Sequence, residues 1–271
     1  MREHLVMSDF TTLSTMIDAD LDPSGRVGRL TLEQPEKLNP LGTRCLRELA
    51  EAAAWFDRTD ASIVIVSGRG RAFSAGFDLR EFAGGAGAEE SAPVSAREQA
   101  DLGRLMAEAM DRMRALTIAS ISGPCVGGGV VLAGCCDLRV AADDTTFSIP
   151  EVDLGIPLAW GGIPRLVREI PPAIVRELVL TCQPFGPNEA ARLGFINRVV
   201  PLADLAATVD DLAASLARKA PSVIYATKRQ VHTALDGVAT TTGAWADTDL
   251  LGAAMADPEA RAAAREYLAR R

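Results

Sequence analysis

Three consecutive glycines and one downstream glutamate have the residue types and the setting for proton-transfer chemistry. Gly127, Gly128 and Gly129 follow a short apolar segment and precede the apolar run 130–133, so they predict a turn that opens a buried helix. The first amides of a helix lack intrahelical partners and its dipole is positive there, so an oxygen with developing negative charge would be stabilised. Glu151 follows a short predicted strand in an apolar neighbourhood. Together these residues predict proton transfer next to a carbonyl group.

A second small-residue segment could supply another backbone donor. Ala75, Gly76, Phe77 and Asp78 follow a predicted strand, and an amide near Phe77 could face a ligand. With the amide near Gly128 it would form an oxyanion hole, provided that neighbouring strands bring the two together. Each feature also has a purely structural interpretation, because glycines often serve close packing and an isolated glutamate is more often a surface acid.

Strands and helices alternate over most of the chain. Apolar and polar residues alternate around a turn in 12–32, which predicts a hairpin, and 42–58 has helical spacing. Further strands are predicted at 62–66, 117–121, 136–141, 147–149 and 195–200, with a helical, turn-rich stretch at 160–193. Beyond residue 202 only helical periodicity remains, over 203–218, 222–236, 240–254 and 258–270. The pattern predicts an α/β core followed by helices whose apolar faces need a partner, such as a neighbouring subunit.

Two segments leave their roles open. Residues 83–96 are small, acidic and without periodicity, which predicts a mobile loop. The next helix carries Leu102, Met106, Met110 and Met113 on one face. This stripe is typical of core packing, and the alternative is an adaptable wall of a binding pocket.

Composition excludes several classes of protein. The net charge of −8 argues against a nucleic-acid partner. No apolar run approaches the ~20 residues of a membrane span, and the N-terminal residues lack the apolar core of a signal peptide, so the sequence predicts a cytoplasmic location without membrane association. Two histidines and five cysteines without a C-x-x-C pair predict buried, reduced thiols and no metal site.

The order and spacing of several segments resemble the enoyl-CoA hydratase/isomerase family, the crotonase superfamily. The matching segments are 34–41, 71–79, 123–129, 136–139, 147–151, 161–166, 190–200 and 226–228. The resemblance implies an α/β fold built as a spiral of ββα units, with residues 1–200 holding an acyl-CoA site and 201–271 forming a helical trimerisation region. It also implies an acyl-CoA thioester as ligand, coenzyme A being part of the substrate rather than a separate cofactor, and a homotrimer or dimer of trimers.

Site residues follow from the resemblance position by position. The oxyanion donors would be the amides of Phe77 and Gly128, and Glu151 would be the acid/base. Residues near the substrate or its CoA moiety would be Lys37, Leu38, Ala75, Gly76, Asp78, Leu79, Gly127 and Val131. Lys37 is the candidate cation for the CoA phosphates, although an ordinary exposed lysine is an equal alternative.

One departure from the family pattern decides the predicted reaction. Enoyl-CoA hydratases carry two glutamates, and here the first position is Val131 while the second is Glu151. A single glutamate is the pattern of the family's Δ3-Δ2-enoyl-CoA isomerases, in which one carboxylate moves a proton from C2 to C4. Partial burial should raise the pKa of that carboxylate. Dienoyl-CoA isomerases need a further aspartate where this chain has Ala159, so that chemistry is rejected.

Three alternatives remain open. The first is a hydratase whose second acid is Asp78 or Glu81, or which uses Glu151 alone. The second is a serine hydrolase, because residues 72–76 nearly match a nucleophile elbow around Ser74, although neither histidine is a suitable partner. The third is a non-catalytic acyl-CoA binder or assembly subunit.

Overall fold

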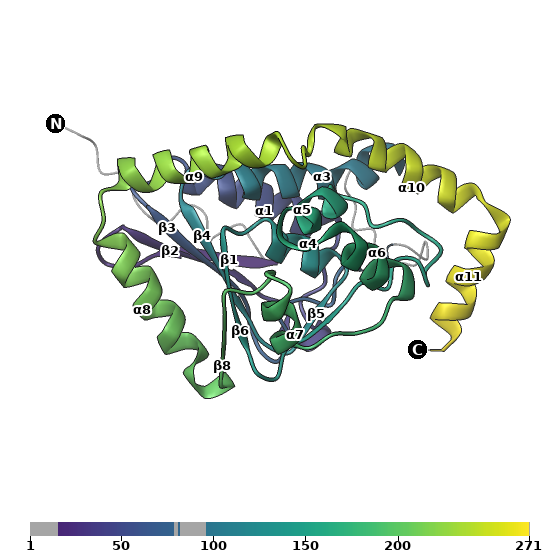
Figure 1. Cartoon of the computed structure of the whole chain (residues 1–271), viewed down its shortest axis with the longest axis horizontal. Coiled ribbons are helices and arrows are strands. Elements are labelled where there is room, and N and C mark those ends of the chain that lie inside the picture. The colour runs from purple at the N-terminus through teal and green to yellow at the C-terminus, as the bar shows by residue number, and fades with distance from the viewer. Residues whose placement is uncertain (1–15, 79–80, 82–95, 271) are drawn as a thin grey trace.

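A six-stranded sheet lies at the centre of the molecule (Figure 1). The computed structural model describes residues 16–78, Glu81 and residues 96–270. The strands lie in the order β1 (Ile17–Leu21), β2 (Val27–Leu32), β3 (Ile63–Gly68), β4 (Leu116–Ile121), β6 (Leu138–Ala142) and β8 (Arg198–Val200). Strands β1 and β2 form the predicted antiparallel hairpin, and every other neighbouring pair is parallel.

A second, short row of strands lies beside the large sheet. It contains β5 (Pro124–Val126) and β7 (Thr146–Ser148), which pair in parallel through Cys125 and Phe147. Single bridges extend the row, from Cys125 to Ser74 and from Phe147 to Phe185. The chain therefore passes through the large sheet and then through this row in each turn, at β3 and Ser74, at β4 and β5, and at β6 and β7. This repetition is the expected crotonase spiral of ββα units.

Helices enclose the main hydrophobic core beside the large sheet. They are α1 (Thr43–Phe56), α3 (Ala96–Arg112), α4 (Gly128–Gly134), α5 (Gly162–Glu169), α6 (Pro172–Thr181) and α7 (Pro187–Arg192). Met106, Met110 and Met113 are almost fully buried in this core. The methionine stripe therefore serves core packing, and its interpretation as a pocket wall is wrong.

The helices after residue 201 begin on the opposite face and then run along the outside (Figure 1). Leu205, Val209 and Ala213 of α8 (Leu205–Ala217) pack on the second face of the sheet. The region continues through α9 (Pro221–Asp236), η3 (Thr242–Ala246), α10 (Asp247–Ala256) and α11 (Pro258–Ala269). No helix in the described part of the chain is both long and apolar enough to cross a membrane.

Several predicted boundaries shift in the structure. Strand β6 begins only at Leu138, because the Asp137 amide donates to Thr117 Oγ1 at 2.9 Å instead of to a backbone carbonyl of β4. Strand β8 begins at Arg198, because the Phe195 amide closes a turn onto Ala190 at 2.9 Å. Residues 83–95 of the predicted loop lie outside the described residues, and Ala96, its predicted last residue, begins α3. All five cysteines are free and buried, as predicted.

Candidate functional site

The glycine turn positions a free amide at the start of α4. Gly127 has φ 50°, a conformation that favours glycine, and its amide donates to Ser148 O at 2.8 Å. This bond ties the turn to β7. Gly128 is the first residue of α4, and its amide has no partner among the described residues. The predicted donor is therefore left without a partner at the positive end of a helix, where a ligand oxygen could accept from it.

The second donor segment is held by hydrogen bonds to the loop that contains Leu38. The amide of Ala75 donates to Leu38 O at 2.8 Å, and Leu41 N donates to Gly76 O at 2.8 Å. Phe77 N, by contrast, has no partner in the described part of the chain. The two loops are thus locked together while one amide is left free.

Asn39 and Ser74 make this arrangement rigid. The Asn39 side chain donates to Arg69 O at 3.0 Å and to Ala72 O at 2.8 Å. Ser74 Oγ donates to Asn39 O at 2.8 Å and accepts from Gly76 N at 3.1 Å. Because these bonds occupy the hydroxyl, Ser74 is a structural residue, and the structure gives the serine hydrolase hypothesis no support.

The two free amides belong to neighbouring segments. Gly76 has φ 81°, and a Cβ built on it would lie 2.5 Å from Val126 O and 3.4 Å from Gly128 N. Only a glycine therefore permits this approach. The structure brings together the loops of Phe77 and Gly128 as the oxyanion-hole hypothesis requires.

Glu151 reaches the same turn from the end of β7. A Cβ on Gly127 would overlap Glu151 Oε1 and lie 3.4 Å from Oε2. Oε2 is buried without a partner among the described residues, although other parts of the residue keep some exposure. Burial raises the pKa of Glu151 to about 7, a hydrogen bond from its own backbone amide opposes the shift, and no second carboxylate contributes. The carboxyl group can therefore accept and return a proton near neutral pH.

Val131 lies in the first turn of α4 and faces apolar neighbours. Its side chain is 2% exposed, and its Cγ2 lies 2.9 Å from where a Cβ of Gly162 would be. Glu81, one alternative second acid, accepts from Thr43 N at 2.9 Å and from Thr43 Oγ1 at 2.6 Å. It is therefore engaged at the start of α1. Asp78 lies beside the same helix start, with its Cβ 3.6 Å from where a Cβ of Gly42 would be.

The remaining predicted residues lie around the site or outside the described chain. Lys37 is exposed in η1 (Pro35–Lys37), directly before Leu38. Leu79 lies outside the described residues. Among the described residues, no cluster of three or more His, Cys, Asp or Glu side chains could hold a metal ion.

Trp160 is a site residue that sequence analysis missed. Its ring stacks edge-to-face on Phe77, with centroids 6.1 Å apart, and a Cβ on Gly128 would overlap it. The available signal was a large aromatic residue directly before the matched segment 161–166.

Comparison with known families fits this geometry. A family model described as Enoyl-CoA hydratase/isomerase matches residues 23–271. The chain belongs to the enoyl-CoA hydratase/isomerase family.

Individual members of the enoyl-CoA hydratase/isomerase family are similar over most of the chain. A probable enoyl-CoA hydratase of Mycobacterium tuberculosis is 37% identical over 207 residues, 73% of this chain and 77% of the relative. Carnitinyl-CoA dehydratase of Escherichia coli K12 is 36% identical over 218 residues, 79% of each chain. The crystal structure of an enoyl-CoA hydratase/isomerase from Xanthobacter autotrophicus Py2 superposes with a TM-score of 0.79 at 27% identity, over 92% of this chain and 91% of that one. The crotonase fold and an enzyme of this family are thereby established.

The raised pKa of Glu151 has a consequence for stability. Its folded pKa of about 7 lies above the ordinary value of 4.5, so the folded protein binds this proton more tightly than the unfolded chain. The free energy of unfolding therefore falls as pH rises from about 4.5 to about 7, by about 3 kcal/mol in total. Because Glu151→Gln removes the ionisable group, we expect it to be about 3 kcal/mol more stable than wild type at pH 8, with the difference vanishing near pH 4.5.

Urea denaturation at both pH values measures this difference. Glu177→Gln, at an exposed position of α6, is the matched control and should leave stability unchanged at either pH. Equal stability of Glu151→Gln and wild type at pH 8 would show that the carboxylate is well solvated.

Proposed function

We propose that this enzyme isomerises 3-enoyl-CoA to 2-enoyl-CoA with Glu151 as its only acid/base. The observation that carries the proposal is the placement of one buried carboxyl group at Gly127, beside the free amide of Gly128, with apolar Val131 where a second acid would be needed. Hydration by the two-glutamate mechanism holds a water molecule between two carboxyl groups. A 1,3-proton shift requires only one base.

The chemistry follows from these groups. The thioester carbonyl accepts hydrogen bonds from Phe77 N and Gly128 N, which stabilise negative charge on its oxygen. Glu151 then removes a proton from C2, and the electrons move into a dienolate. Protonated Glu151 returns the proton at C4, which leaves the double bond between C2 and C3. Loss of one oxyanion donor typically costs ~10²- to 10³-fold in rate.

Hydration of 2-enoyl-CoA is the second candidate. The relatives support it, since the Mycobacterium tuberculosis protein is named a hydratase and the Escherichia coli protein a dehydratase. Glu81 is an unsuitable second acid because Thr43 holds it at α1. Hydration would then depend on Asp78 or on Glu151 alone.

A paired assay separates the two reactions. We expect wild type to convert 3-hexenoyl-CoA to the conjugated 2-enoyl product at least tenfold faster than it hydrates crotonyl-CoA, because only one carboxyl group serves the site. Absorbance near 263 nm rises in the first reaction and falls in the second. Faster hydration would support the second candidate, and binding without either reaction would indicate a non-catalytic acyl-CoA binder.

The proposal also includes a binding residue for the phosphates of coenzyme A and a subunit interface. Lys37 is exposed beside the locked loop of Leu38 and Ala75, and it makes no ion pair with a described residue, so it is free to meet a phosphate. A homotrimer or dimer of trimers would cover the large exposed apolar side chains of the helices from α9 to α10, which are Val223, Val231, Val238, Trp245, Leu250 and Met255.

A further inference from the structure

The Trp160 indole occupies a slot between two helices. A Cβ on Gly128, at the start of α4, would overlap its Cζ3 atom, and a Cβ on Gly103, in α3, would overlap Cε2 and Nε1. The side chain is only 9% exposed. Two glycines on facing helices therefore leave the space that this ring fills.

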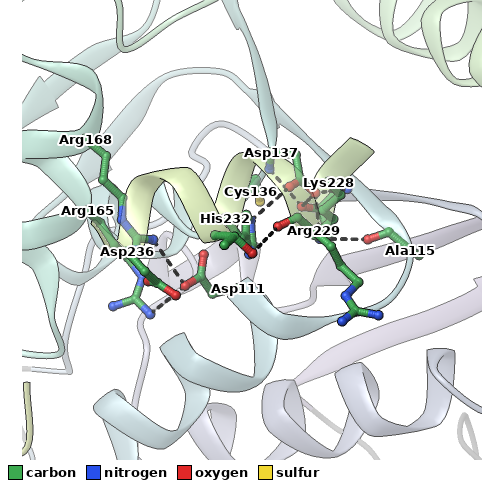
Figure 2. A network of polar contacts seen from close by, with 12 residues as sticks. Asp111, Ala115, Cys136, Asp137, Arg165, Arg168, Lys228, Arg229, His232 and Asp236 are labelled. Carbon is green, nitrogen blue, oxygen red and sulfur yellow. Dashed lines mark hydrogen bonds and ion pairs between the residues drawn. The ribbon is translucent and has the colours of Figure 1, made fainter. Parts of the chain in front are cut away.

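The backbone of Trp160 is fixed as well. Its φ is 62°, a strained conformation for a bulky residue that persists only when surrounding contacts hold it. Arg165 Nη1 donates to Trp160 O and to Gly161 O, each at 3.1 Å, while Asp247 accepts from Gly161 N at 2.7 Å. Arg165 in turn pairs with Asp111 at 3.3 Å (Figure 2). The turn is thus held from α3, α5 and α10.

The indole and the candidate base contact consecutive residues. Glu151 lies against Gly127 and Trp160 against Gly128, and the Cα atoms of neighbouring residues are about 3.8 Å apart. A thioester carbonyl on Gly128 N must place its C2 and C4 atoms within reach of Glu151. The following acyl carbons then lie beside the fixed indole.

We propose that Trp160 determines specificity by closing the acyl site, so that the enzyme takes short-chain acyl-CoA thioesters of about four to six acyl carbons. This inference rests on the proposed function, because it takes an acyl thioester bound to the two free amides as its starting point. Chain length matters through space alone, because the buried ring occupies the volume that further methylenes would need.

Binding of two saturated thioesters tests the inference without any reaction. Isothermal titration calorimetry measures butyryl-CoA and decanoyl-CoA against wild type, Trp160→Ala and Trp160→Phe. We expect wild type to gain no affinity from the longer chain. In Trp160→Ala decanoyl-CoA should gain at least about tenfold over butyryl-CoA, because each buried methylene is worth up to about fourfold.

Matched variants keep the outcome decisive. Leu180→Ala removes an apolar side chain that is 64% exposed in α6 and should behave as wild type. Trp160→Phe keeps a smaller aromatic ring, so its affinity for decanoyl-CoA relative to butyryl-CoA should rise by less than in Trp160→Ala. This variant replaces Trp160→Ala in the test if the alanine variant does not fold. The inference is overturned if wild type already binds decanoyl-CoA more tightly than butyryl-CoA and both Trp160 variants show the same preference. That result would leave the proposed acyl-CoA site unaffected. Failure to bind either thioester overturns the proposed function as well.

Discussion

Glu151→Gln is expected to lower kcat for 3-enoyl-CoA isomerisation by about 10²- to 10⁴-fold, the range for loss of a positioned acid/base. The amide cannot accept the C2 proton, while the free amides of Phe77 and Gly128 remain in place to bind the thioester. The change should therefore appear in kcat, with KM altered little. Glu151→Asp, which keeps the acid but withdraws it by one methylene, should retain intermediate activity.

Isotope transfer and pH dependence identify the base more directly than rate alone. A single buried carboxyl group should deliver part of the deuterium from C2 of the substrate to C4 of the product. Wild-type kcat/KM should rise with pH to a plateau above about 7, because the base must be unprotonated and burial raises the pKa of Glu151 to about 7. Complete loss of label to solvent, or unchanged activity in Glu151→Gln, contradicts the single-base mechanism.

Lys228→Met is expected to lower the free energy of unfolding by about 3–5 kcal/mol, the cost of leaving one member of a buried ion pair alone. Lys228 Nζ lies 2.7 Å from Asp137 Oδ2 and donates to Ala115 O at 2.9 Å (Figure 2). Burial would raise the pKa of Asp137, but the His232 side chain, 3.6 Å from its Oδ1, and the Lys228 charge outweigh this effect and hold that pKa below its usual range. Removing the ammonium group leaves a largely buried carboxylate without the lysine charge that pairs with it.

Chemical denaturation at pH 7 measures this loss. Lys219→Met, at an exposed position before α9, should change stability by no more than about 0.5 kcal/mol. The double variant Lys228→Met with Asp137→Asn should recover part of the loss, because the unpaired charge is then absent. A loss in Lys228→Met no larger than that in Lys219→Met would show that Asp137 is stabilised without the lysine.

Local sequence patterns predicted most of the scaffold. The hairpin around residues 22–25, the buried parallel strands and the glycine turn at Gly127 each depend on neighbouring residues, so periodicity and turn chemistry suffice. The start of α11 is also local, since Asp257 caps it by accepting from Glu259 N and Ala260 N, both at 2.9 Å. The fold class itself came from the resemblance, because the spiral is a property of spacing between distant segments.

Contacts between distant segments were beyond these patterns. Trp160 lies in the site because Gly103 and Gly128 leave room for its ring. Asp247, which follows Gly161 by 86 positions, accepts a hydrogen bond from the Gly161 amide. The sequence allowed Glu81 to be a second acid, whereas in the structure its carboxylate accepts a hydrogen bond from Thr43 N. Such contacts depend on which helices and strands become neighbours in the fold. The local periodicity of apolar and polar residues carries no information about that.

The ion pair between Lys228 of α9 and Asp137 also has a consequence for folding during synthesis. Lys228 contacts Ala115, which precedes it by 113 positions. At about 5–20 residues per second, Lys228 is synthesised roughly 6 to 23 s after Ala115 and roughly 5 to 18 s after Asp137. During this interval the nascent chain carries the Asp137 carboxylate without its counter-charge. The Asp137 carboxylate therefore acquires this counter-charge only after α9 has been synthesised, late in the making of the chain.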